Sequence, residues 1–393
     1  MNRWALVAVL WFIACLNYVD RQVIFSLFPL LENDLGLSAV ELGLLSSVFL
    51  WIYGFLSPFA GYWAGRASKV KILLLGLLIW SAVTVATGLA QNYAQLIAAR
   101  ALMGFSEAFY LPAALALINA VHGNQTRGMA TGLHQTGLYT GLILGGGIGG
   151  MLGAAYGWRT PFLLLGAIGL IYALLAGPWL RKAEPPFQAQ SHSFGKVLPT
   201  LLAARGYKPI AIVFGFRGLI DWLVYTWLPI FLYERFHMSL GAAGFSATFF
   251  VQAASFAGVL IGGWMADRTQ RRLLVQAYGL FLAAPFLLIL ASTTSEWILY
   301  SALISMGLGK GIYDANAMPS LVGLVPGQLR ASAFAWMNAL SCFIGGISAA
   351  LAGWAKQTVG LEAAFWTAGA ASLICGLILF HAQRNSQDKE VFS

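Results

Sequence analysis

Residues 61–66 read GYWAGR, and a related hexapeptide, GWMADR, recurs at residues 263–268. Landmarks on both sides of it recur in the same order and at a nearly constant offset. Pro29, Ser38 and Gly43 match Pro229, Ser239 and Gly244, and the pairs Gln125/Arg127 and Gly157/Phe162 match Gln328/Arg330 and Gly360/Phe365. A correspondence held over so many positions indicates that the chain is a duplication, with two halves of similar structure.

Long apolar runs fill both halves. Only 9% of the residues are charged and 59% are hydrophobic, whereas a soluble domain carries about 25% charged residues. A helix needs about 20 apolar residues to cross a bilayer, and the sequence predicts twelve such spans: 4–31, 39–64, 70–89, 93–120, 127–155, 161–181, 207–233, 240–265, 272–292, 295–318, 327–355 and 361–383.

These spans predict an all-α membrane protein made of two six-helix bundles related by pseudo-two-fold symmetry. The bundles are expected at 1–181 and 207–393, with a polar cytoplasmic linker at 182–206. Paired six-helix repeats that enclose a midplane site are typical of alternating-access transporters. A transporter implies no catalytic residues and no cofactor.

The basic residues lie in short loops between the spans, so the net charge of +9 does not indicate a nucleic-acid surface. With the N-terminus inside, the far side of the membrane receives only Arg159, Arg235 and Lys356. Lys and Arg favour the cytoplasmic side. We therefore expect a multi-pass protein of the bacterial inner membrane with both termini cytoplasmic, and an uncleaved first helix.

Eight Asp, Glu, Lys and Arg residues lie deep within predicted spans, away from the span ends. They are Asp20 and Arg21 on the first span, Arg100 and Glu107 on the fourth, Arg217 and Asp221 on the seventh, and Lys310 and Asp314 on the tenth. A charge at bilayer depth costs roughly 2.5–3.5 kcal/mol on insertion scales, so these groups should face a polar cavity and one another. The i,i+4 pairs share a helix face. A purely structural role, in which the pairs only neutralise each other, is the alternative interpretation.

The segment NYVDR, residues 17–21, resembles the first-helix signature of the anion:cation symporter family, which includes sugar-acid, hexuronate and sialic-acid carriers. WSAVT at 80–84, Arg100-x3-Gly104-x2-Glu107 and WLP at 227–229 match the same family. Spinster-type lipid transporters are similar over the N-terminal motifs. Both resemblances imply the major facilitator fold and secondary transport.

By this resemblance Asp20 and Glu107 are proton-coupling residues, and Arg21 and Arg100 bind the substrate carboxylate or modulate the protonation of those two carboxylates. A low-dielectric cavity favours a neutral carboxylic acid, whereas a nearby guanidinium favours the ionised form. Substrate that occupies the arginine would therefore promote protonation. The expected function is proton-coupled symport of a small organic anion, such as a sugar acid, by a monomer in the lipid bilayer. The alternatives are a spinster-like exporter of a lysolipid or other amphipathic molecule, and a receptor or scaffold; a zwitterionic substrate stays open as well.

Further polar residues on the spans are candidate substrate contacts. They are Tyr18, His134, Gln135, Arg217, Asp221, Tyr225, Gln252, Lys310, Asp314 and Asn338. Close helix packing explains the glycines at 145, 147 and 150 better than a nucleotide-binding loop does.

The two hexapeptides introduce loops that resemble the cytoplasmic gating motif of the superfamily. The candidate gating residues are Gly61, Arg66, Lys69, Asp267, Arg268 and Arg271. The first copy has Gly65 where the motif usually has Asp, so its gate is expected to be weaker or differently built.

Overall fold

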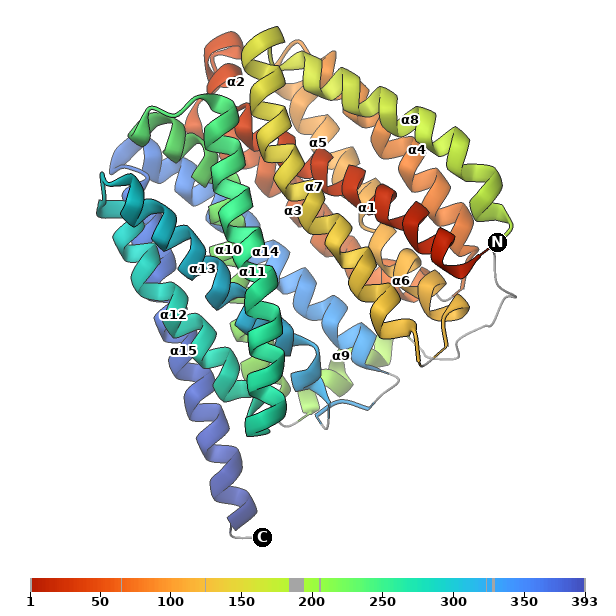
Figure 1. Ribbon diagram of the computed structural model, residues 1–393, viewed down its shortest axis with the longest axis vertical. Coiled ribbons are helices and arrows are strands. Elements are labelled where there is room, and N and C mark those ends of the chain that lie inside the picture. Colours follow the sequence, from red (N-terminus) through yellow and green to blue (C-terminus); the bar gives the residue numbers. More distant parts are fainter. Residues whose placement is uncertain are drawn as a thin grey trace. The chain divides into compact units, whose positions relative to one another are not determined.

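The computed structural model describes residues 2–64, 66–123, 125–183, 194–204, 206–322, 324–326 and 329–391. Every regular element in these ranges is a helix (Figure 1). In chain order the helices are α1 (Arg3–Ser26), α2 (Phe28–Leu35), α3 (Ala39–Ala64), α4 (Lys69–Gly88), α5 (Tyr93–Glu107), α6 (Tyr110–Val121), α7 (Arg127–Tyr156), α8 (Arg159–Arg181), α9 (Phe194–Ala203), α10 (Tyr207–Phe236), α11 (Leu240–Thr269), α12 (Arg272–Ser292), α13 (Glu296–Ala317), the 3-10 turn η1 (Pro319–Leu321), α14 (Arg330–Thr358) and α15 (Glu362–Val391).

The all-helical, membrane-spanning fold class is confirmed. Within the described ranges, eleven segments are long and apolar enough to cross a membrane, counting α5 and α6 as one. The remaining predicted span, 295–318, forms α13, which is 22 residues long but not among the eleven. Lys310, Asp314 and Asn316 lower its apolar character, so its polar residues need protein neighbours.

Prolines divide two of the predicted spans. The span predicted at 4–31 is α1 followed by α2, with Pro29 near the start of α2. The span predicted at 93–120 is α5 followed by α6, broken at Ala108 and Phe109. Proline has no N–H to donate four residues back and its ring clashes with that carbonyl, so Pro112 interrupts the helix at Ala108, directly after Glu107.

The chain forms two compact units. Unit 1 comprises residues 1–192 and 228–248, and unit 2 comprises 193–227 and 249–393. The predicted polar linker 182–206 contains α9, a helix the prediction missed, whose Val197 and Leu201 pack with Met337 of α14. The rest of the linker from 184 to 193 lies outside the described residues.

Unit 1 is held together by close packing of α7 on α1, two helices that run side by side in Figure 1. Glycines recur every fourth residue on the face of α7 that meets α1: Gly137, Gly141, Gly145, Gly149 and Gly153. A Cβ at any of them would collide with α1 or the residues just after it. The prediction that this glycine-rich stretch serves helix packing is therefore confirmed.

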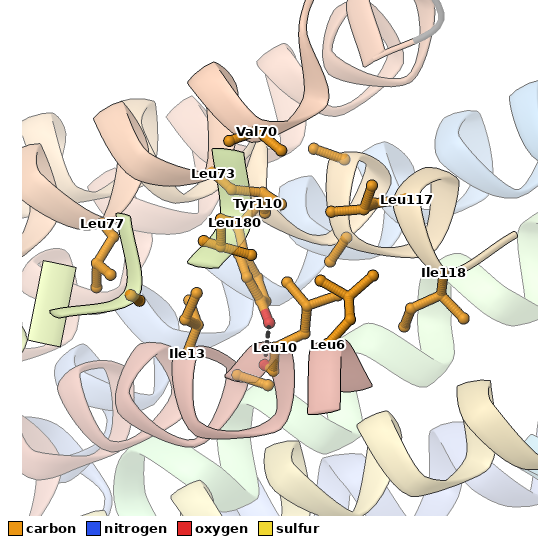
Figure 2. Close-up of a cluster of buried hydrophobic side chains, with 14 of the residues drawn as sticks. Leu6, Leu10, Ile13, Val70, Leu73, Leu77, Tyr110, Leu117, Ile118 and Leu180 are labelled. Carbon is orange, nitrogen blue, oxygen red and sulfur yellow. Dashed lines mark hydrogen bonds between the residues drawn. The ribbon is translucent and has the colours of Figure 1, made fainter. Parts of the chain in front are cut away.

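One end of unit 1 is filled by apolar side chains from α1, α4, α6, α7 and α8 (Figure 2). Leu10, Leu73, Leu117 and Leu180 are all fully buried there. Tyr110 lies within this cluster, and its hydroxyl donates to the Leu10 carbonyl, as the dashed line in Figure 2 shows. The core thereby fixes the residue that follows Glu107 by one helical turn.

Unit 2 packs α12 against α13 and α15. Gly279 on α12 meets Gly309 on α13 backbone to backbone, and Gly307 and Gly311 of α13 lie equally close to α11. These glycines let α13 approach its neighbours.

Candidate functional site

The charged residues that lie deep within the helices of unit 1 form a buried cluster of two cations and two carboxylates. Asp20 and Arg21 on α1 are 2% and 4% exposed, and Arg100 and Glu107 on α5 are 1% and 0% exposed. Arg21 Nε and Glu107 Oε2 form an ion pair at 2.5 Å across the two helices. We call these four residues the unit 1 tetrad.

The other two members of the unit 1 tetrad, Asp20 and Arg100, form no ion pair among the described residues. Arg100 donates from Nε to the Leu45 carbonyl at 3.2 Å and contacts Met103 Sδ, but its Nη2 has no hydrogen-bond acceptor among the described residues. Asp20 lies beside the Thr84 hydroxyl and within electrostatic reach of Arg100 and Glu107, but in the described part of the chain its Oδ1 has no donor.

Aromatic rings from α1 and α3 surround the two guanidinium groups. Arg21 Cζ lies 4.7 Å from the Tyr18 ring centroid and 4.4 Å from that of Tyr53. Phe49 lies between the two arginines, with Arg21 at 5.1 Å and Arg100 at 4.7 Å from its centroid. Cation–π contacts hold a cation without neutralising its charge, so the rings leave the positive charge of both guanidinium groups in place.

The sequence interpretation missed the contribution of α3. Phe49 and Tyr53 are i,i+4 on a helix that carries no charge at this depth, and only their contacts distinguish them from core aromatics. Gly104, which belongs to the α5 motif, explains how α3 comes so close, because a Cβ there would lie 2.6 Å from the Phe49 carbonyl oxygen.

His134 lies on α7 and is fully buried. Its Nε2 is 2.8 Å from the Tyr110 hydroxyl, and its Nδ1 has no partner among the described residues. The next residue, Gln135, is half-buried. Tyr110 had not been singled out by the sequence interpretation.

The charged residues of unit 2 pair along their own helices. Arg217 Nη1 and Asp221 Oδ1 are 2.6 Å apart on α10, and Lys310 Nζ and Asp314 Oδ2 are 2.5 Å apart on α13. Both i,i+4 pairs are thus confirmed. Asp221 also lies within electrostatic reach of Lys310 and Asp314.

A small cavity of about 20 Å³ adjoins these pairs and is lined by Arg217, Asp221, Tyr225, Lys310 and apolar residues. That volume holds about one water molecule. The amide of Gln252 donates to the Tyr225 hydroxyl at 3.1 Å. Asn338 lies half-buried on α14.

The candidate gating residues lie at helix ends. Gly61 is in the last turn of α3, and Arg66, whose guanidinium carbon is 3.7 Å from the Tyr62 ring centroid, precedes Lys69 at the start of α4. In the second copy Asp267 pairs with Arg272 at 3.5 Å, and Arg268 lies over Trp264. Arg271 caps α12. Gly65, the departure from the motif, lies outside the described residues.

Among the described residues, no group of three His, Cys, Asp or Glu side chains is placed to hold a metal ion. The three cysteines are buried and form no disulfide with one another.

Comparison with known proteins gives consistent matches. The profile of the Major Facilitator Superfamily matches residues 10–305 and 210–391. The chain is 26% identical over 375 residues to the probable galactarate/D-glucarate transporter of Escherichia coli K12, covering 83% of this chain and 84% of that protein. It is 27% identical over 316 residues to the probable L-galactonate transporter of the same organism, covering 73% of this chain and 68% of that protein.

A second group of relatives is the spinster proteins. The chain is 26% identical over 315 residues to protein spinster of Drosophila melanogaster, covering 73% of this chain and 50% of that protein. The crystal structure of a bacterial homolog of the human lysosomal transporter Spinster, in an inward-facing and unoccupied conformation, superposes with a TM-score of 0.83 at 20% identity and covers 97% of each chain.

Proposed function

This chain belongs to the major facilitator superfamily and is a multi-pass membrane transporter of small molecules, and we propose that it is a proton-coupled symporter of a small organic anion. The observation that carries the proposal is the unequal pairing within the unit 1 tetrad. Arg21 and Glu107 neutralise each other, whereas Asp20 and Arg100 are buried and form no ion pair with any described residue.

An unpaired buried charge is unstable, and the two unpaired groups are relieved by different ligands. A buried carboxylate without a counter-ion is stabilised by taking up a proton, and a buried guanidinium by binding an anion. Because Asp20 and Arg100 lie within electrostatic reach, loading only one of them leaves the other charge uncompensated. Proton and anion binding therefore favour each other, which is the thermodynamic requirement for symport.

In this proposal Asp20 is the first proton acceptor and Arg100 the first anchor of the substrate carboxylate. The Arg21–Glu107 pair opens when substrate engages Arg21, and the freed Glu107 carboxylate then takes over the proton from Asp20, so that one proton accompanies each anion. Asn17, a buried residue that lies beside the Glu107 carboxylate, supplies a further polar contact.

Relatives support the choice of substrate class. The two Escherichia coli relatives described above are named as transporters of galactarate or D-glucarate and of L-galactonate, which are sugar acids. We extend that class to this chain. The polar side chains proposed as further substrate contacts are those of Tyr18, His134, Gln135, Arg217, Asp221, Tyr225, Gln252, Lys310, Asp314 and Asn338.

The asymmetric distribution of Lys and Arg between the loops supports placing both termini in the cytoplasm of a bacterial cell, with the chain in the inner membrane. The gating residues Gly61, Arg66, Lys69, Asp267, Arg268 and Arg271 would then lie on the cytoplasmic side. A monomer is sufficient for this mechanism, because each coupling residue is supplied by one chain.

Uptake of radiolabelled sugar acids into proteoliposomes under an imposed pH gradient tests the proposal. We expect gradient-driven accumulation by the wild type, and for Glu107→Gln loss of accumulation with retention of substrate exchange. Uptake that does not respond to the pH gradient would refute proton coupling, and undiminished accumulation by Glu107→Gln would remove that residue from the coupling step.

A second candidate function is export of an amphipathic molecule. A groove of about 390 Å³ on α4 and α5 is lined by Val83, Ala86, Leu89, Gln95, Ala98, Ala99 and Leu102, and it suits an acyl chain. Gln95 is the one polar residue in that lining, which gives no site for a charged headgroup. Transport of a lysophospholipid with no response to sugar acids would favour this alternative.

A further inference from the structure

The hydrogen bonds around Tyr110 fix which nitrogen of His134 carries the proton. The Tyr110 hydroxyl lies 2.8 Å from the Leu10 carbonyl oxygen and 2.8 Å from His134 Nε2. A carbonyl oxygen only accepts, and a tyrosine hydroxyl has one hydrogen. That hydrogen is donated to Leu10, because the opposite assignment would bring two oxygen lone pairs together at 2.8 Å.

It follows that Tyr110 accepts the hydrogen bond from His134, so Nε2 carries the imidazole hydrogen. The other nitrogen, Nδ1, is then a lone-pair acceptor. It is fully buried and has no donor among the described residues. A buried acceptor left without a donor is destabilised, and a ligand or a water that donates a hydrogen relieves it.

His134 belongs to the same polar region as the unit 1 tetrad. Tyr110 lies within electrostatic reach of Tyr18, and the Tyr18 ring lies 4.7 Å from the Arg21 guanidinium carbon. Gly141, two turns after His134, brings α7 against Cys15 and Tyr18 of α1. Two side chains, Tyr110 and Tyr18, thus link His134 to Arg21 of the unit 1 tetrad.

We propose that His134 determines substrate specificity, with Nδ1 accepting a hydrogen bond from a hydroxyl group of the transported acid. This inference rests on the proposed function and narrows its substrate class to hydroxylated acids. Contact occurs in a state of the transport cycle that opens this part of unit 1. Tyr110 acts as a positioning residue, because its bond to Leu10 keeps Nδ1 in the accepting form.

The physical basis is the cost of leaving the acceptor unpaired. A site built to bond a substrate hydroxyl rejects the analogue that lacks it much more strongly than an apolar pocket rejects a changed methylene. A non-hydroxylated acid would satisfy the arginines and leave Nδ1 without a donor.

The experiment measures binding by calorimetry to the full chain in lipid nanodiscs. The probe is whichever of D-gluconate, D-galactonate, D-glucarate and D-glucuronate binds most tightly, together with its monodeoxy analogues. For the wild type we expect at least one deoxy analogue to bind about tenfold more weakly than the parent, or worse. In His134→Phe, which has no acceptor to leave unpaired, that ratio should fall to about twofold. In His134→Asn, whose Oδ1 can replace Nδ1, it should be largely restored.

Tyr110→Phe and Tyr172→Phe form a matched pair. Each removes a tyrosine hydroxyl that donates to a backbone carbonyl of α1, Leu10 or Val9, but of the two only Tyr110 bonds His134. Tyr110→Phe frees the imidazole to place its hydrogen on Nδ1 and should lose the discrimination, whereas Tyr172→Phe should keep it. This pair decides the matter even if the His134 variants fail to fold.

Equal binding of every deoxy analogue by the wild type overturns the inference, as does full discrimination in Tyr110→Phe. Either result leaves proton-coupled anion transport intact. If none of the four acids binds, the proposed sugar-acid substrate class fails, and the inference fails with it.

Discussion

Substitution of Asp20 by Asn separates proton coupling from substrate binding most directly. In the structure this carboxylate lies beside Arg100 and Glu107 but forms no ion pair, so its removal breaks no salt bridge. Asn keeps nearly the same shape and cannot take up a proton. We therefore expect a folded variant that still binds and exchanges the substrate.

The magnitude follows from the charges of the unit 1 tetrad. Two guanidinium groups and two carboxylates sum to zero, and binding one proton with one monoanion leaves the sum at zero. The loaded tetrad then carries no charge across the membrane, so the pH difference alone drives uptake. One pH unit is worth about 1.4 kcal/mol, so the wild type should accumulate a monoanion about tenfold per unit of pH difference, with no effect of membrane potential. The Asp20→Asn variant should bring the monoanion only to about the same concentration on both sides of the membrane, which is no net accumulation.

The assay is uptake into proteoliposomes at a pH difference of one unit, with and without a potassium diffusion potential, and counterflow exchange measured in parallel. Asp34→Asn is the control, since Asp34 is an exposed carboxylate at the end of α2. Tenfold accumulation by Asp20→Asn would refute the role of Asp20. If accumulation by the wild type depends on the membrane potential and not on the pH difference, the electroneutral ratio of one proton per monoanion is refuted.

Three further predictions concern stability, each measured as a thermal unfolding midpoint in detergent. Gly104→Ala should lower the midpoint, because the added methyl group meets backbone atoms of Phe49 and Tyr53 and such overpacking costs about 1–3 kcal/mol. The control Gly132→Ala, which has open space around it, should raise the stability by up to about 1 kcal/mol. Equal effects of the two variants would contradict the α3–α5 contact. Asp221→Asn should destabilise the protein by about 3–5 kcal/mol, because it leaves Arg217 buried without its ion-pair partner. The double variant Arg217→Gln/Asp221→Asn should recover most of the lost stability. A double variant as unstable as the single one would show that the broken ion pair is not the cause of the destabilisation. The hydrogen bond from Trp158, aided by Arg159, lowers the pKa of Asp34, so its contribution is present above pH about 4 and is lost as the pH falls through that lowered pKa. Asp34→Asn should therefore cost about 0.2–1 kcal/mol at pH 7 and progressively less as the pH falls through the lowered pKa; a pH-independent difference would exclude the ionised contact.

The sequence by itself determined the fold class and the helices that carry the charges. A bilayer leaves no choice but helices of about 20 apolar residues, so the spans, the duplication and the placement of Asp20, Glu107, Asp221 and Asp314 follow from linear pattern. The i,i+4 pairs of unit 2 were predictable for the same reason, since 3.6 residues per turn places such neighbours together on any helix. Helix α9 and the breaks before Pro29 and Pro112 were missed. The spans were identified by the length of their apolar runs, and that length does not reveal a short amphipathic helix or a break within a run.

Only the tertiary structure decided which carboxylate of unit 1 is paired. Arg21 follows Asp20 in the chain, yet consecutive residues on a helix point about 100° apart, and Arg21 reaches across to Glu107 on α5 instead. That choice depends on the closeness of α1, α3 and α5, which Gly104 and the glycines of α7 permit. The same packing leaves Asp20 Oδ1, Arg100 Nη2 and His134 Nδ1 buried without a hydrogen-bond partner in the described part of the chain. Pairing across helices is set by distances that no sequence spacing contains, and it is this pairing that distinguishes the proposed proton acceptor from its neighbours.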